Sequence, residues 1–98
     1  MRRDLDGVLR RYRAVILLHD LLRGYLSTFE GGEAVVTRRR LVRFAASRGV
    51  PARELPANSA FRRLVHRFSR VVDERGREWR LVREEPRGCK RRYVYAVR

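Results

Sequence analysis

The first third of the chain carries apolar residues at helical spacing. Residues 5–29 contain no proline, and their pattern predicts one long helix. Its apolar residues form two stripes that lie more than a quarter turn apart, at about 100° of rotation per residue. The first stripe is Leu5, Leu9, Tyr12 and Ile16, and the second is Leu18, Leu21, Leu22, Tyr25, Leu26 and Phe29. We expect the second stripe to pack on the chain's own core and the first to contact another molecule. A break near Leu17 with one continuous core is the alternative.

A second helix is expected near the middle of the chain. After a Gly-Gly turn, the short β-branched run at 34–36 is suited to an edge strand. Thr37 is then placed to cap a helix over residues 38–48, with Gly49 as its stop. Residues 50–57 contain two prolines and form a connection, with room for one short helical turn.

A third helix, capped by Asn58 or Ser59, is expected to run to Val72 or Asp73, with Gly76 closing it. Its core face consists of Phe61, Leu64, Val65, Phe68, Val71 and Val72. The opposite face consists of Ser59, Arg62, Arg63, His66 and Arg70. A helix that is buried on one side and lined with arginine on the other fits the major groove of DNA. The alternative, a solvated basic face, would favour charges of both signs.

The last stretch alternates apolar and polar residues, which is typical of strands. One strand presents Trp79, Leu81 and Arg83, and the returning strand presents Arg91, Tyr93, Tyr95 and Val97. Residues 85–88 suit a type I turn followed by a bulge at Gly88. This register pairs Trp79 with Tyr95 and Leu81 with Tyr93, which buries the aromatic rings.

The formal net charge of +14 is unevenly distributed. Residues 37–72 hold ten arginines against Glu54 alone, a net charge of +9, whereas residues 1–36 carry +1 and residues 73–98 carry +4. Such a concentration indicates a site for a polyanion. A membrane span is not expected, because the longest apolar run, at 14–18, is far shorter than the required ~20 residues. No secretory signal is readable.

Arginine accounts for 24 of the 25 basic residues, with Lys90 the exception, and the chain has no Gln, one Asn and one Ile. This composition fits an archaeal or thermophile-like source, and GC-rich coding explains it equally well. The planar guanidinium binds phosphate and guanine in bidentate fashion, so the preference for arginine also suits nucleic acid.

An enzyme is not expected. Two histidines, His19 and His66, and one cysteine, Cys89, offer no nucleophile–base pair and no set of metal ligands. We therefore predict no catalytic residue, metal, cofactor or small-molecule ligand. Cys89 is interpreted as a plain strand residue, with an intermolecular disulfide as the alternative.

The order of these elements resembles a winged helix-turn-helix DNA-binding domain. The residues Ala-Ala-Ser-Arg-Gly-Val at 45–50 are similar to the A-x-x-x-G-V end of that motif's second helix. The likeness covers about residues 18–97, and the long connection at 51–57 and the long first helix depart from it. It implies an α+β, mostly helical fold with a C-terminal hairpin wing. We expect one domain over 1–98, with an N-terminal extension at 1–17 and a DNA-binding core at 18–98.

The resemblance also implies which residues contact DNA. Helix 58–72 would lie in the major groove and present Ser59, Arg62, Arg63, His66 and Arg70. The wing at 85–92 would contribute Arg87, Lys90, Arg91 and Arg92. Backbone phosphate would meet the start of the second helix at Arg38, Arg39, Arg40 and Arg43, helped by the helix dipole.

We therefore expect a regulator of transcription that binds double-stranded DNA, is cytoplasmic and nucleoid-associated, and forms a homodimer through its N-terminal helix. Three alternatives stay open: a chromatin-like protein that coats DNA without sequence preference, a ribosomal or other RNA-binding domain, and a module for protein contacts. The N-terminal helix could also contact DNA instead of a second copy, through Arg2, Arg3, Arg10, Arg11 and Arg13.

Overall fold

The computed structural model describes the backbone of residues 2–88 and 90–98, and the side chains from Gly7 onward within those ranges. The helices are α1 (Arg2–Ser27), α2 (Arg38–Ser47) and α3 (Asn58–Arg67), with a short 3₁₀ turn at Ala52–Glu54. The strands are β1 (Glu33–Val36), β2 (Arg70–Val72), β3 (Glu78–Arg87) and β4 (Lys90–Val97). Cys89 and the side chains of Arg2, Arg3 and Leu5 lie outside the described part of the chain.

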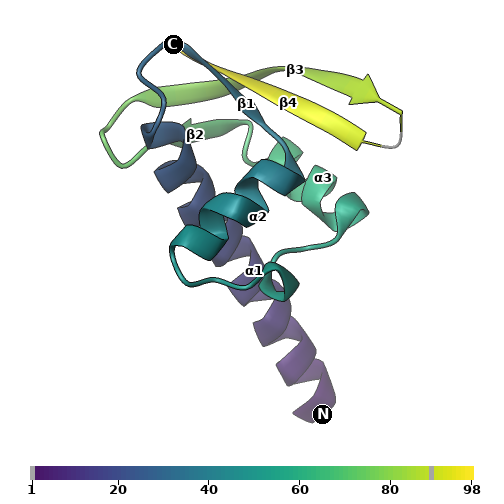
Figure 1. Cartoon of the computed structure of the whole chain (residues 1–98). Coiled ribbons are helices and arrows are strands. Elements are labelled where there is room, and N and C mark those ends of the chain that lie inside the picture. Colours follow the sequence, from purple (N-terminus) through teal and green to yellow (C-terminus); the bar gives the residue numbers. More distant parts are fainter. Residues whose placement is uncertain (1, 89) are drawn as a thin grey trace.

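The fold is α+β, as predicted from the sequence, but it is roughly half helical and not mostly helical. The four described strands form one antiparallel sheet in the order β1-β4-β3-β2. The C-terminal half of α1, together with α2 and α3, lies against one face of this sheet, and the N-terminal half of α1 extends away from the rest of the molecule (Figure 1). Large buried side chains from both layers form the core, among them Leu22, Leu41, Phe61, Trp79 and Tyr95. No helix of the described residues has the length and apolar character to cross a membrane.

The α1 helix runs without a break, so the alternative of a break near Leu17 is wrong. Residues of the second stripe are buried, namely Leu18, Leu21, Leu22, Tyr25 and Leu26. The described residues of the first stripe are exposed, and Tyr12 is 65% exposed. The second stripe therefore packs on the chain's own core, as predicted, because this stripe reaches the sheet and α2. The prediction that the first stripe contacts another molecule stays a prediction.

The α2 helix forms as the sequence predicts, apart from its last residue. The Thr37 hydroxyl accepts a hydrogen bond from the backbone N–H of Arg40 at 3.1 Å and so caps the helix. Arg48 is the residue that ends the helix, and Gly49 follows at φ +79°, a conformation that favours glycine. The connection to α3 contains the short 3₁₀ turn.

The third helix begins at Asn58, within the predicted range, but its predicted cap and its predicted end are both wrong. Ala57 is its N-cap, and no side chain among the described residues caps it, so Asn58 and Ser59 lie inside the helix. It ends at Arg67, and the C-cap residue Phe68 leaves the helical conformation at ψ 49°, where its carbonyl oxygen accepts a hydrogen bond from the Tyr95 hydroxyl at 2.8 Å.

The residues that were expected to complete α3 form strand β2 instead. Val71 belongs to the sheet, where it pairs with Trp79 and is buried in the core. An apolar residue at this position also fits the helical spacing, which is why the sequence pattern extended the helix too far. Arg70 pairs with Arg80 and is exposed. Since neighbouring residues of a strand face opposite sides, Arg70 lies on the face of the sheet away from α3. Its prediction as a residue of the DNA-binding helix is therefore wrong.

The hairpin of β3 and β4 has a different register from the one predicted. Trp79 pairs with Val97 and Leu81 with Tyr95, and the ladder continues to Arg87 and Lys90. The predicted turn residues 85–87 are thus part of β3. The bulge lies at Val82 rather than at Gly88, because Leu81 and Arg83 pair with consecutive residues of β4.

The bulge at Val82 changes which side chains of β3 face the helices. Arg83 pairs with Val94, and Glu84 pairs with Tyr93, whose ring is buried in the core. Cross-strand partners share a face of the sheet. Glu84 therefore takes the helix-facing position that strict alternation assigned to Arg83.

Candidate nucleic-acid interface

A groove of about 910 Å³ lies between the first turns of α2 and α3 and the neighbouring ends of β3 and β4. We call it the basic groove. Of the fourteen described residues that line it, eight are basic and none is acidic. The basic ones are Arg38, Arg39, Arg40, Arg62, Arg87, Lys90, Arg91 and Arg92, and the others are Thr37, Val42, Asn58, Ser59, Phe61 and Tyr93. Three segments far apart in the sequence thus contribute positive charge to one concave surface.

The α2 side of the groove combines cations with a helix N-terminus. The guanidinium of Arg38 donates from Nε to the carbonyl oxygen of Pro56 at 2.8 Å, which ties α2 to the segment before α3. Arg39 and Arg40 are exposed. The backbone N–H groups of a first helical turn attract anions, so these residues suit phosphate. Arg43 is exposed but does not line the groove, although the preceding residue, Val42, does.

The α3 side contributes fewer of the predicted residues than the sequence suggested. Ser59 and Arg62 line the groove, whereas Arg63 and His66 are exposed on α3 outside it. The first N–H groups of α3 have no side-chain acceptor among the described residues, so they remain available to an anion.

All four predicted wing residues line the groove, at the turn between β3 and β4. Tyr93 forms part of its floor beside Phe61, with ring centroids 5.9 Å apart. Tyr93 is only 3% exposed, and this burial raises the pKa of its hydroxyl above its ordinary value.

Glu84 is a feature of this region that the sequence analysis missed. Its Oε1 accepts from Nε of Arg62 at 2.9 Å and its Oε2 accepts from Nη2 at 3.3 Å. Nε2 of His66 lies 3.4 Å from Oε2, and Nη1 of Arg91 lies 3.5 Å from Oε1. Hydrogen bonds from Arg62 hold the pKa of the Glu84 carboxyl below its ordinary value, although partial burial opposes them. No sequence signal pointed to this contact, because strict alternation in β3 assigned the helix-facing position to Arg83 and not to Glu84.

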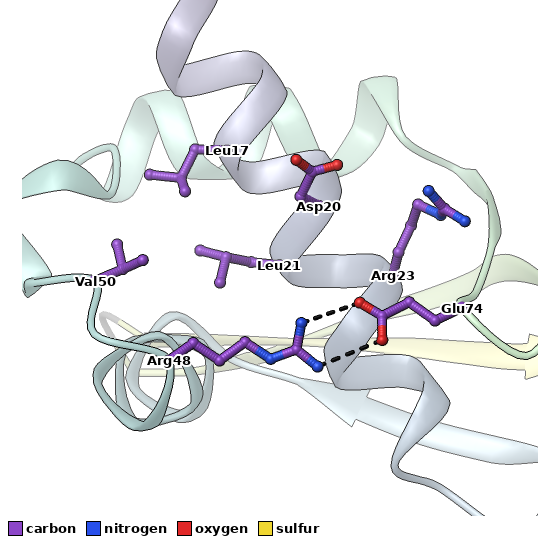
Figure 2. Close-up of a pocket in the computed structure, with 7 residues that line it drawn as sticks. All are labelled: Leu17, Asp20, Leu21, Arg23, Arg48, Val50 and Glu74. Atoms are coloured by element: carbon purple, nitrogen blue, oxygen red, sulfur yellow. Dashed lines mark hydrogen bonds and ion pairs between the residues drawn. The ribbon is translucent and has the colours of Figure 1, made fainter.

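A second, smaller hollow of about 360 Å³ lies beside the middle of α1. Figure 2 shows Leu17, Leu21 and Val50 on its apolar side and an ion pair of Arg48 with Glu74 across from them. Because this hollow carries charges of both signs, it does not attract a polyanion as the basic groove does.

Among the described residues, no group of three or more His, Cys, Asp or Glu side chains could hold a metal ion. No family model, curated protein or solved structure matches the chain.

Proposed function

We propose that the chain is a winged helix-turn-helix protein that binds double-stranded DNA in the basic groove and regulates transcription. The observation that carries this proposal is the convergence of eight basic residues, from α2, α3 and the β3–β4 hairpin, on one groove without an acidic lining residue among those described. Phosphate neutralisation by such a surface supplies most of the affinity of DNA-binding proteins.

The order and pairing of the elements support the winged-helix part of the proposal. A helix, a strand, two helices and a hairpin follow one another, and β1 pairs with β4 at the edge of the sheet. The hairpin ends beside the first turn of α3, so a duplex contacted by α3 would also reach the hairpin turn. Two features depart from the pattern: the 3₁₀ turn before α3 and the additional short strand β2.

The position of the aromatic residues favours duplex DNA over single-stranded RNA. Proteins that bind single strands stack the bases on exposed aromatic rings. Trp79 and Tyr95 are fully buried here, and Tyr93 is nearly so. Among the described Phe, Tyr and Trp side chains, Tyr12 is the most exposed, and it lies on α1 and not in the groove.

A salt titration of duplex binding tests the electrostatic basis of the proposal. We expect the logarithm of the binding constant to fall with the logarithm of salt concentration, by a slope of about −0.9 for each phosphate contacted. Fluorescence anisotropy with a labelled duplex measures this slope. In an Arg87→Gln/Arg92→Gln variant the slope decreases in magnitude by about 2 and affinity falls about tenfold.

The matched control removes two charges outside the groove. Arg53 and Arg75 do not line it, so an Arg53→Gln/Arg75→Gln variant retains affinity within about twofold. Equal losses in both double variants would show that the groove is not the binding site.

Selection from random duplexes, with structured RNA as competitor, then distinguishes a regulator from the alternative functions. An enriched sequence motif supports regulation, and unselective retention of duplexes supports coating of DNA. Capture of RNA contradicts both of these functions.

We also propose that a second copy of the chain covers the exposed stripe of α1. The described members of this stripe are Leu9, Tyr12 and Ile16, and Val8 lies on the same helix beside Leu9; all four side chains are about half or more exposed. They recur every three to four residues on one side of a helix that projects from the body (Figure 1). Two copies of a helix with this repeat bury their stripes by packing on each other.

A further inference from the structure

Glu84 lies on strand β3 of the hairpin and faces α3. The proposed binding of DNA gives this carboxylate no role. Three side chains surround the carboxylate of Glu84: the guanidinium of Arg62 and the imidazole of His66 from α3, and the guanidinium of Arg91 from β4. The Glu84 side chain is 15% exposed, so the carboxylate is largely withdrawn from solvent. Two of these partners, Arg62 and Arg91, also line the basic groove.

We propose that Glu84 determines specificity by competing with nucleic-acid phosphate for the cations of the groove. This inference rests on the proposed binding of duplex DNA. The Nε and Nη2 atoms of Arg62 form a fork that matches a carboxylate, a phosphate or the edge of a guanine. Since Glu84 already occupies that fork, a phosphate gains Arg62 only by displacing the carboxylate.

The displacement has a cost that depends on the ligand. Leaving a partly buried carboxylate without its partner is unfavourable. A phosphate, which every sequence presents at the same spacing, therefore gains little from Arg62. A ligand that supplies further contacts to α3, such as a guanine edge in the right place, offsets the cost. Glu84 thus reduces binding to arbitrary sequences more than binding to a preferred one.

The neighbouring residue provides a matched control. Glu85 follows on the same strand and faces the opposite side of the sheet, where its Oε2 accepts from Nε of Arg83 at 3.1 Å. Arg83 does not line the groove, whereas Arg92, which pairs with Glu85 across the strands, does. Glu85→Gln therefore controls for the loss of a negative charge near the groove without the release of Arg62. Glu84→Gln and Glu85→Gln therefore change the net charge equally and preserve nearly the same side-chain shape, but only the first releases Arg62, His66 and Arg91.

Duplex binding by these variants tests the inference. We expect Glu84→Gln to bind a random-sequence duplex about tenfold more tightly than the unsubstituted protein, with a salt slope steeper by about 1, and Glu85→Gln to stay within about twofold. The ratio of affinities for selected and random duplexes should fall in Glu84→Gln alone. A merely structural role for Glu84 would not steepen the salt slope.

Two controls keep the outcomes distinct. Thermal unfolding establishes that both variants fold, and Glu84→Asp, which keeps the charge but shortens the reach to Arg62, should bind random duplexes with intermediate affinity. Equal affinities for Glu84→Gln and Glu85→Gln, or weaker binding by Glu84→Gln, would overturn the role of Glu84 while leaving the proposed function intact. A lack of duplex binding by all of these proteins would overturn both.

Discussion

At the scale of single residues, Asp73 is the buried charge on which the sheet depends. It is 1% exposed and lies in the turn between β2 and β3. Its Oδ1 accepts from the backbone N–H of Arg75 at 2.8 Å and of Arg77 at 2.9 Å, and its Oδ2 accepts from Nε1 of Trp79 at 2.8 Å. One side chain thus fixes the turn and satisfies the indole N–H at the centre of the core.

Substitution of Asp73 should therefore be costly and should change how stability depends on pH. Burial by itself raises the pKa of the Asp73 carboxyl, but hydrogen bonds from Trp79 and from the backbone at Arg77 and Arg75 outweigh it and hold the pKa below its ordinary value of 3.8. The ionised form therefore stabilises the fold above pH 3.8, and this stabilisation disappears as the pH falls through the lowered pKa.

We expect Asp73→Asn to lower the free energy of unfolding by about 2–3 kcal/mol at neutral pH, measured by urea denaturation. Glu74→Gln is the control, because its pair with Arg48 is solvent-exposed and such pairs contribute about 0–1 kcal/mol. Repeating the Asp73→Asn measurement below pH 4 should show a smaller difference from the unsubstituted protein. A difference that is constant with pH would show that the ionised carboxylate is not the stabilising form.

At the scale of elements, the boundary between α3 and β2 separates two arginines that the sequence assigned to one surface. Arg63 lies on the exposed face of α3, and Arg70 lies on the opposite side of the sheet. If α3 contacts base edges, Arg63 can take part in sequence recognition and Arg70 cannot.

We expect Arg63→Ala to reduce the ratio of affinities for selected and random duplexes by about 5- to 100-fold, the range for loss of one base contact. Arg70→Ala should leave this ratio and the affinity within about twofold, since Arg70 is separated from the groove by the sheet. Competition binding between the selected and the random duplex measures the affinity and the affinity ratio of each variant. A uniform loss for Arg63→Ala on every sequence would instead support coating of DNA.

At the scale of the whole molecule, the charge and the exposed stripe of α1 occupy different regions. The basic groove belongs to α2, α3 and the hairpin, whereas the stripe lies on the half of α1 that extends away from them (Figure 1). A dimer through α1 would therefore leave both grooves open and present them twice to one duplex.

Sedimentation equilibrium at tens of micromolar tests the dimer. We expect the unsubstituted protein to be dimeric and a Leu9→Gln/Ile16→Gln variant to be monomeric, because each substitution removes apolar area from the stripe. Arg10→Gln/Arg13→Gln changes exposed residues of the same helix outside the stripe and should remain dimeric. A monomeric unsubstituted protein would contradict the proposal.

The sequence by itself determined the elements whose signals are local. Helical spacing and the absence of proline defined α1, the Thr37 cap and Gly49 bounded α2, and the division of charge along the chain located the basic region. Local hydrogen bonds, backbone conformation and the period of apolar residues decide such features, so they can be read without knowledge of the fold.

Tertiary structure alone decided the end of α3 and the placement of Glu84. Val71 fits a helical and a strand pattern equally well, and its pairing with Trp79 makes the choice. The bulge at Val82 shifts the alternation of β3 by one residue, which brings Glu84 instead of Arg83 to Arg62. Strand pairing and its bulges arise from contacts between distant segments, and one extra residue reverses the face of every side chain beyond it.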